Sequence, residues 1–267
     1  MVADVAPGHG VSRSIFGLPV YDLTWPSALA LVDELIALPA GQQSQISFLN
    51  ANNANIMLAD GQYREILGRH MVLPDGIGID LASSVLSGNR FAANLNGTDF
   101  VPALLTYIGR PLKVGLLGGK PEVLAAAAAR FRRHSPWHQF VEISDGYFDK
   151  NHPESVIAMI ARSRLDILLI GLGTPMQEKW MDRHIGKEHA RLVIGVGALF
   201  DFVSGSVPRA PTWLRRLRGE WLYRLWLEPR RLWRRYLLGN PVFLLSVLWY
   251  RLRAGKRPPT ENTRSPR

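Results

Sequence analysis

One aspartate lies in a stretch that is suited to acid–base chemistry. Asp75 follows the apolar run MVL at residues 71–73 and stands inside the sequence LPDGIG, whose glycines leave room for another group to approach. A carboxylate held at the end of a strand acts as a general base when burial raises its pKa. The alternative is a turn-forming Asp-Gly pair without a catalytic role, and the residue types alone favour that alternative.

Two glycine-containing turns are suited to holding a phosphate. Gly118 and Gly119 end one apolar run, and Gly171 and Gly173 lie in the sequence GLGTP at the end of another. Glycines there let backbone N–H groups approach a phosphate, and the start of the next helix adds positive partial charge. Neither stretch has the G-x-G-x-x-G spacing of dinucleotide-binding proteins, so an ordinary tight turn is an equal alternative for each. The two together favour a nucleotide or a nucleotide sugar as ligand.

The sequence offers little for a metal ion. It contains no cysteine and no Asp-x-Asp pair, so the usual divalent clamp on a nucleotide diphosphate is missing. His134 and His138 are four residues apart, but Pro136 between them disrupts the helix face. We therefore expect no metal site and no cofactor, and the positive charge for a diphosphate must then come from arginines.

Arginines near the C-terminus are the candidates for that charge. Arg231 and Arg234, three residues apart after Pro229, share a face of a predicted helix. Arg224 lies seven residues before Arg231, and its convergence with the other two depends on the bend at Pro229. A solvated basic helix face is the commoner meaning of such a charge run and is the alternative.

Positive charge is concentrated in this part of the chain. Of the formal net charge of +10, residues 209–267 carry 15 Lys and Arg against three Asp and Glu, or +12, which leaves −2 for residues 1–208. Such asymmetry predicts an anionic partner: a nucleic acid, lipid head groups or a phosphorylated substrate. The longest uncharged run, residues 236–250, is broken at Pro241 and is shorter than the roughly 20 residues of a spanning helix. An interfacial helix on anionic lipid fits better, and an amphipathic helix packed on the body is the alternative.

Short apolar runs alternate with helical patterns up to residue 208. Strands are predicted at 46–50, 113–117, 140–143, 166–171 and 191–195, and helices at about 53–68, through 125–129, from about 153, and at 176–187. Continuous apolar strands that alternate with helices predict a parallel sheet covered on both faces. With right-handed crossovers this gives an α/β, Rossmann-like body whose ligands lie beyond the C-terminal ends of the strands.

The pattern changes to helices without strands after the prolines of VPRAP, residues 207–211. We predict three parts: an α/β catalytic body that binds a nucleotide sugar at 1–208, a helical, membrane-proximal appendage at 209–256, and a disordered tail at 257–267. Within the basic appendage, Pro229 suits the start of a new helix, and Asn240-Pro241 predicts another break.

Eight stretches carry a resemblance to a known family. In chain order they are FLNANNANIMLA, LPDGIGIDLAS, NLNGTDFVPAL, VGLLGGKPEVL, SDGYF, DILLIGLGTPMQEKWM, GVGALFDFVSGSVPRAP and EWLYRLWLEPRRLWRRYLLGNP. Through them, residues 16–253 resemble the WecG/TagA/CpsF glycosyltransferases (glycosyltransferase family 26). The ordered set is far more specific than any single stretch.

The resemblance implies an inverting, metal-independent glycosyltransferase, bound peripherally at the cytoplasmic face of the cell membrane. Such an enzyme moves a sugar from a nucleotide diphosphate, typically UDP, to a polyprenyl-diphosphate-linked saccharide in cell-surface or exopolysaccharide biosynthesis. The expected partners are therefore a UDP-sugar, that lipid-linked acceptor and an anionic membrane surface. The sugar, the acceptor saccharide and the oligomeric state stay open.

The same resemblance implies roles for individual residues. By match to the family's D-G-x-G stretch, Asp75 is the expected base. The residues expected to bind substrate are Asn50, Asn96, Asp99, Gly118, Gly119, Gly171, Gly173, Gln177 and Asp201, and those expected at the diphosphate and acceptor are Arg224, Arg231 and Arg234. The chain departs from the family at Phe48, where many members have threonine, so a polar contact of that threonine does not carry over.

Three other functions compete with this interpretation. A nucleic-acid-binding protein would use the Trp- and Arg-rich appendage to track phosphates and stack bases. It leaves the glycine turns and Asp75 without a task, so we expect no nucleic-acid partner. The second alternative is a membrane-associated scaffold with an inactive body. The third, a nucleotide-dependent oxidoreductase, is weakened by the missing dinucleotide spacing.

Overall fold

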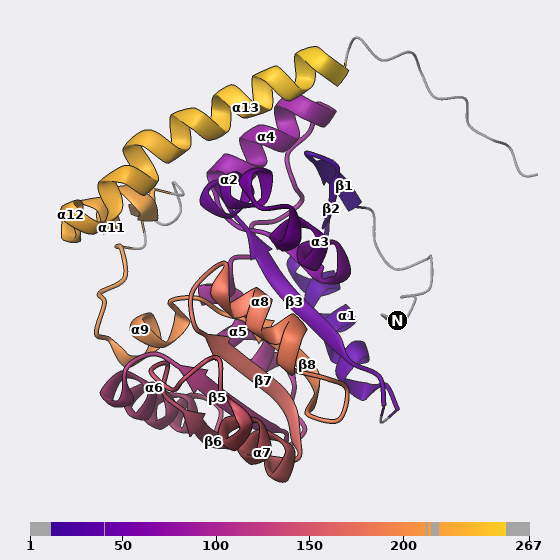
Figure 1. Ribbon diagram of the computed structural model, residues 1–267, viewed down its shortest axis with the longest axis vertical. Helices are drawn as coiled ribbons and strands as arrows, with labels where there is room; N and C mark the ends of the chain where they lie inside the picture. The colour runs from indigo at the N-terminus through magenta and orange to yellow at the C-terminus, as the bar shows by residue number, and fades with distance from the viewer. Residues whose placement is uncertain (1–11, 40, 212, 215–218, 255–267) are drawn as a thin grey trace, which may run out of the picture.

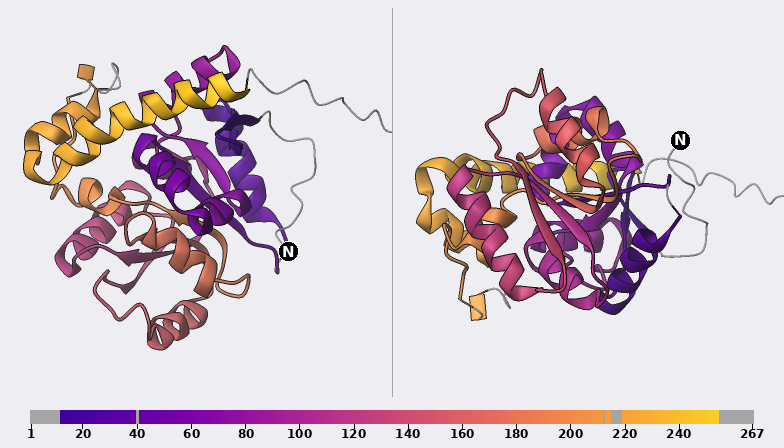
Figure 2. Two further views of the ribbon diagram at one scale, coloured as in Figure 1. Left: turned by 45° about the horizontal axis from the view of Figure 1, so that its top comes forward. Right: turned by 90° about the horizontal axis from the view of Figure 1, so that it is seen from below.

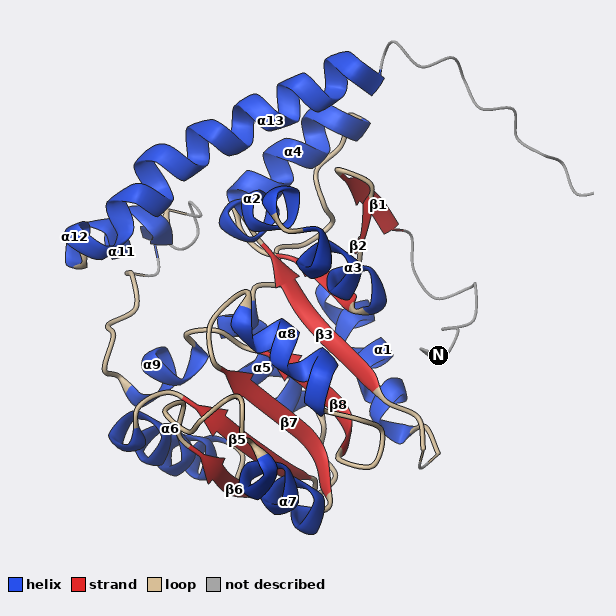
Figure 3. Ribbon diagram, in the orientation of Figure 1, coloured by secondary structure: helices blue, strands red, loops and turns tan. Residues whose placement is uncertain are grey.

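The structure, a computed structural model, describes residues 12–39, 41–211, 213–214 and 219–254. Its centre is a six-stranded parallel sheet in the order β4-β3-β8-β7-β5-β6, with helices on both faces (Figures 1 and 3). The predicted α/β, Rossmann-like fold is therefore confirmed. The tail predicted to be disordered, 257–267, lies outside the described residues.

Most strands of this sheet are buried on both faces, as their continuous apolar sequences require, whereas the edge strand β6 is buried only at Phe140 and Ile143. The six strands are β3 (Ser44–Leu49), β4 (Met71–Pro74), β5 (Lys113–Gly118), β6 (Gln139–Ser144), β7 (Leu165–Gly171) and β8 (Ala190–Gly195). In β7, Ile167 and Leu169 belong to the core on one face of the sheet, whereas Leu168 and Ile170 belong to the core on the other. Because all six strands run in the same direction, their C-terminal ends lie along one edge of the sheet.

Two sets of helices cover the sheet. The helices of the body are α1 (Trp25–Ala37), α2 (Ala51–Ala59), α3 (Gly61–Arg69), α4 (Ile77–Ser87), α5 (Gly97–Tyr107), α6 (Pro121–His134), α7 (Glu154–Ser163), α8 (Met176–His184) and α9 (Leu199–Ser204). One face packs on α1, α5, α6 and α9 through a core that includes Phe100, Phe131 and Phe200. The other face packs on α7 and α8 through Ile160 and Met181.

A third core lies beside β4. There α2, α3 and α4 pack with an antiparallel hairpin of β1 (Ser12–Ile15) and β2 (Leu18–Tyr21). The sequence analysis did not predict this hairpin. Its apolar residues Ile15, Leu18 and Val20 are buried in the third core.

The helix predicted at about 53–68 is in fact two helices, α2 and α3, which meet at Asp60. The Asp60 carboxylate accepts a hydrogen bond from the Tyr63 N–H at 3.0 Å and so caps the second helix. The prediction of one continuous helix was wrong because a short acidic side chain can take a backbone donor from the helix ladder.

The chain ends in α11 (Glu220–Leu227), α12 (Pro229–Trp233), the π-helical turn η1 (Arg234–Leu238) and α13 (Gly239–Ala254). The helix start predicted at Pro229 is confirmed. The break predicted at Asn240-Pro241 is wrong, since α13 runs through both residues. In η1 the Gly239 N–H bonds to the Arg234 carbonyl, five residues back. This wider turn lets the helix continue although Pro241 lacks a backbone donor.

The helix α13 lies across α2 and α4 (Figure 2). Phe243 and Val247 are buried there. The rings of Phe243 and Tyr250 meet Phe16 edge-on, with centroids 5.9 and 5.4 Å from the Phe16 centroid. Apolar burial therefore fixes the position of the C-terminal helices on the body.

The opposite side of α13 is apolar and open to solvent. Leu245, Leu248, Trp249 and Leu252 are each more than half exposed. The guanidinium of Arg253 lies over the Trp249 ring, 3.4 Å from its centroid. Within the described residues, no helix has both the length and the apolar character to cross a bilayer. The helix α13 thus has one face against the body and one exposed apolar face.

Candidate active site

Asn50 and Asp75 meet at the C-terminal edge of the sheet. The paired strands β3 and β4 end just before them. The Asp75 N–H donates to the Leu49 carbonyl at 2.8 Å, which fixes the backbone after β4. Asn50 caps α2 by accepting from the Asn53 N–H at 3.0 Å, and its Nδ2 donates to Asp75 Oδ2 at 3.1 Å. The cap of a helix therefore also orients the carboxylate.

The surroundings of Asp75 raise its affinity for a proton. Burial raises the pKa of the Asp75 carboxyl, and the negative charge of Glu220 acts in the same direction. The hydrogen bond from Asn50 and the positive charges of Arg235 and Arg224 lower the pKa, but the net direction is upward. A carboxylate with a raised pKa accepts a proton more readily than an ordinary aspartate, which is the property of a general base.

Two of the predicted arginines lie near predicted acidic residues. Burial raises the pKa of Asp201 on α9, and the charges of Arg231 and Arg224 oppose that rise. The guanidinium of Arg224 also lies over the Phe202 ring, 5.1 Å from its centroid. Arg224 thus acts on both Asp75 and Asp201, whereas Arg231 acts on Asp201.

The third predicted arginine lies differently. Arg234 is exposed and stacks on Trp233, with its guanidinium carbon 5.4 Å from the ring centroid. Its neighbour Arg235 is half-buried and is the cation with the largest effect on Asp75. Sequence analysis missed Arg235, although its position four residues after Arg231 is also a helical spacing.

Three arginines around the site carry buried donors without a hydrogen-bond acceptor in the described part of the chain. These donors are the Nε atoms of Arg209, Arg224 and Arg235. Buried donors are nearly always paired in folded proteins, because an unpaired one costs about 1–3 kcal/mol. Their chemistry fits an anionic ligand such as a diphosphate.

Arg209 links the start of α5 to the start of α11. Its Nη1 donates to Asp99 Oδ1 at 2.7 Å, and its Nη2 lies 3.5 Å from Glu220 Oε2. Asn96 caps α5 by accepting from the Asp99 N–H at 3.0 Å, and its Nδ2 donates to Asp99 Oδ2 at 3.0 Å. The predicted substrate residues Asn96 and Asp99 are therefore bonded to each other and joined to the C-terminal helices.

The predicted glycine turns lie beside each other after β5 and β7. Gly118 has φ of +117°, and a β-carbon on it would lie 2.3 Å from the Gly171 carbonyl oxygen, so a side chain there is excluded. The Gly119 N–H bonds to the Gly171 carbonyl at 3.2 Å. Gly173 has φ of +81° and open space where a β-carbon would be, so a ligand can approach its backbone.

Gln177 faces the protein interior, with only 2% of its surface exposed. Its Oε1 accepts from the Gly197 N–H at 3.0 Å, and its Nε2 donates to Glu178 Oε1 at 2.8 Å. Gln177 thus holds the turn after β8 from the interior of the protein. The predicted site residues after β3, β4, β5 and β7 share one edge of the sheet, and Gln177 supports that edge.

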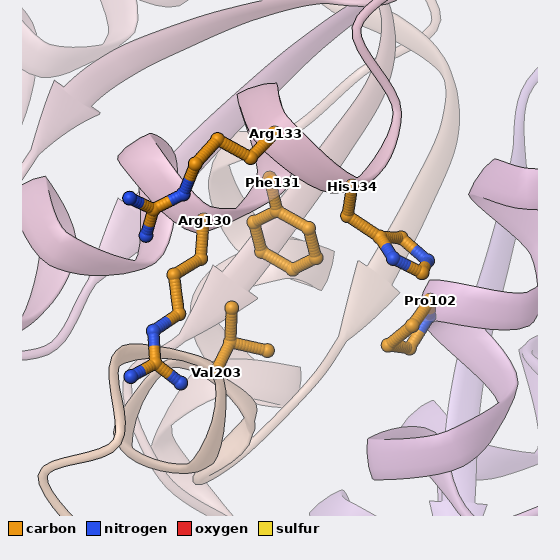
Figure 4. A pocket seen from close by; sticks show the side chains of 6 residues that line it. All are labelled: Pro102, Arg130, Phe131, Arg133, His134 and Val203. Atoms are coloured by element: carbon orange, nitrogen blue, oxygen red, sulfur yellow. The ribbon is translucent and has the colours of Figure 1, made fainter.

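A hollow on the surface lies apart from this edge, and no metal-ion cluster is found among the described residues. An open hollow of about 400 Å³ lies between α5, α6 and α9, and its lining is Pro102, Arg130, Phe131, Arg133, His134 and Val203 (Figure 4). None of these is a predicted site residue. Among the described residues, no three His, Asp or Glu side chains gather in a way that could hold a metal ion.

Comparison with known sequences defines the class of the protein. Residues 13–257 match the sequence model of a family of glycosyl transferases, so the chain is a glycosyltransferase. It belongs to the glycosyl transferase WecG/TagA/CpsF family. The family and the enzyme class expected from the eight sequence stretches are therefore confirmed.

Two curated relatives are similar over most of the chain. One, from Bacillus subtilis (strain 168), is 35% identical over 205 residues, which is 76% of this chain and 78% of the relative. The other, from Bacillus spizizenii (strain ATCC 23059 / NRRL B-14472 / W23), is 32% identical over 221 residues, or 81% and 84%. Both are named N-acetylglucosaminyldiphosphoundecaprenol N-acetyl-beta-D-mannosaminyltransferase.

The hydrogen bond between Asn50 and Asp75 predicts a change in the pH dependence of sugar transfer. Because this bond lowers the pKa of Asp75, Asn50→Ser should raise that pKa, while a serine still caps α2. A general base works only when deprotonated, so the loss of kcat/KM on acidification should begin at higher pH in the variant. The matched control is Asn89→Ser at an exposed position after α4. Coincident pH profiles of the wild type and Asn50→Ser would contradict the role of this bond.

Proposed function

We propose that the protein transfers a sugar from a UDP-sugar to a polyprenyl-diphosphate-linked saccharide, with inversion at the anomeric carbon and without a metal ion. The observation that carries this proposal is the partly buried Asp75 carboxyl within electrostatic reach of Arg224 and Arg235, whose Nε donors lack an acceptor among the described residues. A base and a cationic cradle for a diphosphate are the two parts that such a transfer needs. The names of the two relatives support an undecaprenyl-diphosphate-linked acceptor.

The donor is held at the edge of the sheet in this proposal. The backbone at Gly173 is open to a ligand, and the turns at Gly118, Gly119 and Gly171 bring the ends of β5 and β7 together. Asn96 caps the start of α5, and Asp201 lies in the first turn of α9. Ligands of α/β proteins bind beyond the carboxyl ends of the strands, which supports a nucleotide sugar here.

The reaction then follows from the positions of the charged groups. Asp75 takes the proton from a hydroxyl of the acceptor saccharide, and the hydroxyl oxygen attacks the anomeric carbon of the donor. The bond from that carbon to the diphosphate breaks on the opposite face, UDP leaves with the electron pair, and the configuration inverts. Arg224 and Arg235 stabilise the charge that develops on the diphosphate. The proton remains on Asp75 until the product leaves.

We further propose that the C-terminal helices bind the cytoplasmic face of the membrane as a peripheral appendage, residues 209–256, of the body at 1–208. The exposed apolar face of α13 fits the boundary between head groups and acyl chains. Exposed arginines near both ends of the helix, at 234 and at 251 and 253, suit anionic lipid head groups. The enzyme would then bind its lipid-linked acceptor at the membrane surface, where that acceptor is held.

Direct product analysis tests the reaction. We expect the purified protein to join N-acetylmannosamine from its UDP donor to a short-chain polyprenyl-diphosphate N-acetylglucosamine, with the product mass and the inverted anomeric centre read by mass spectrometry and NMR. Asp75→Asn should lower kcat by about 100-fold or more with the fold intact, because a general base contributes about that much. Asp33→Asn, paired with Arg110 on the surface, is the control. Undiminished transfer by Asp75→Asn, or loss of transfer with a chelator, would contradict the mechanism.

Substitution of single arginines tests the diphosphate cradle. Arg224→Gln and Arg235→Gln should each lower kcat/KM by about tenfold or more, since each removes a charged hydrogen bond to the diphosphate. Arg230→Gln, at an exposed position of α12, is the matched control. Comparison of Arg234→Gln with Arg235→Gln decides which of the two neighbours acts, and the structure favours Arg235. A larger loss from Arg234→Gln would overturn that choice.

Vesicle sedimentation tests the membrane surface. The protein should bind phosphatidylglycerol vesicles more strongly than phosphatidylcholine vesicles, and added salt should weaken the binding. The double variant Leu248→Gln/Leu252→Gln should bind at least about tenfold more weakly, because it removes two apolar side chains from the lipid boundary. Met159→Gln changes an exposed apolar residue on α7 and is the control. Equal binding by the double variant would remove α13 as the docking helix.

A further inference from the structure

A buried carboxyl group lies beside the turns after β7 and β8, at the edge of the sheet where the donor is proposed to bind (the donor edge). Glu178 of α8 is 1% exposed. Its Oε1 accepts from Thr174 Oγ1 at 2.9 Å and from Gln177 Nε2 at 2.8 Å. Thr174 belongs to the turn after β7, and Gln177 bonds to the turn after β8. One carboxyl oxygen therefore joins two turns that come from neighbouring strands.

These bonds decide which way the Gln177 amide points. Because Nε2 is the donor to Glu178, Oε1 must face the Gly197 N–H, which it accepts at 3.0 Å. A flipped amide would place its oxygen against the Glu178 oxygen and its NH₂ group against the Gly197 N–H. The space around the amide is also tight, since a β-carbon on Gly195 would lie 2.9 Å from Gln177 Nε2. Glu178 therefore selects one orientation of a side chain that cannot move aside.

The turn that Gln177 holds is continuous with the donor edge. Residues 195–197 join β8 to α9, which carries Asp201. The Gly197 carbonyl oxygen lies 3.0 Å from the place where a β-carbon on Gly171 would be, so the turns after β7 and β8 are packed against each other. A change in the orientation of the Gln177 amide would therefore reach the backbone at Gly171 and the start of α9.

The surroundings of Glu178 do not supply a positive charge. Burial raises its pKa, and the hydrogen bonds from Gln177 and Thr174 lower it less than burial raises it. The titratable group that faces it from α3 is Tyr63, itself buried, with a raised pKa. The nearest lysine in sequence, Lys179, is paired with Asp60. In the described part of the chain, Glu178 thus has hydrogen-bond partners at Oε1, none at Oε2, and no ion pair.

We propose that Glu178, through its hydrogen bonds, is a positioning residue for the donor site: it fixes the Gln177 amide and, through it, the turn at Gly197. This inference rests on the proposed function for its effect on the donor. The positioning itself is a property of the chain alone. Glu178 touches neither substrate in this scheme, so its loss should change donor binding more than the chemical step.

Two substitutions separate the hydrogen bond from the charge. Glu178→Gln keeps the shape and the acceptor for Gln177 and Thr174, so its KM for the UDP-sugar should stay within about threefold of the wild type. Glu178→Leu keeps the bulk without an acceptor, and its KM should rise by about tenfold or more with a smaller change in kcat. Glu65→Gln at an exposed position of α3 is the matched control. Equal losses in both variants, or no loss in Glu178→Leu, would overturn the proposal.

Amide hydrogen exchange at Gly197 provides a readout that needs no substrate. Its exchange should be as slow in Glu178→Gln as in the wild type and at least about tenfold faster in Glu178→Leu. If the donor is not a UDP-sugar, the KM comparison disappears while the exchange pattern remains, so failure of the proposed function is distinguishable from failure of this inference. Unchanged exchange in Glu178→Leu would overturn the inference even if the proposed function holds.

The pH dependence of stability tests the raised pKa that burial gives Glu178, also in case Glu178→Leu does not fold. A carboxyl whose folded pKa is raised loses stability as pH rises from its ordinary value of 4.5 up to the folded pKa. Glu178→Gln has no such proton to lose. Its unfolding midpoint should therefore move upward relative to the wild type as pH rises above 4.5. A difference that stays constant with pH would overturn the proposal, because Glu178 would then not be held in the buried position that fixes Gln177.

Discussion

The partial removal of the Asp75 carboxylate from water determines what the rest of the site must supply. Asp75 is partly buried just after β4, and a carboxylate withdrawn from water requires hydrogen bonds and positive charge around it. The body supplies the hydrogen bond from Asn50. The positive charge comes from Arg224 and Arg235, which follow the last strand of the sheet by a long stretch of chain. The electrostatics of Asp75 therefore depend on the docking of the C-terminal helices.

Both apolar contacts and ion pairs hold the C-terminal helices on the body. Burial of Phe243 against Phe16 contributes about 1.5–3 kcal/mol, and it does not depend on which polar group faces which. The ion pairs of Arg209 with Asp99 and Glu220 contribute less, because desolvation offsets much of their attraction, but they fix the orientation. Asp99 is itself held by the cap of α5, so the appendage is aligned with the same strand ends that carry the proposed donor. An anionic ligand that satisfied the arginine donors would strengthen this arrangement further.

Apolar patterns predicted the strands and the place of Asp75, because an apolar run and the residue that follows it can be recognised from neighbouring residues alone. The inner strands β3, β8, β7 and β5 are buried on both faces and therefore read as largely apolar runs. The missed features depend on geometry that residue types do not encode locally. The spacing of an ordinary α-helix placed Arg231 and Arg234 on one face. In the structure a π-helical turn starts at Arg234, and Arg235 is the arginine with the larger effect on Asp75. The inward direction of Gln177 likewise follows from its bond to Gly197 in the turn after β8, which spacing along one helix cannot predict.

The same continuous run of helix connects the proposed membrane contact to the proposed chemistry. The elements α12, η1 and α13 follow one another without a gap, so Arg235 lies one turn before the helix that exposes Leu248 and Leu252. A helix that lies along a membrane surface is held at the level of the head groups, which is also the level of a lipid-linked diphosphate. The depth of the apolar face in the lipid then determines the height at which the guanidinium meets that diphosphate. Membrane docking and diphosphate binding are, in this proposal, two consequences of one helix position.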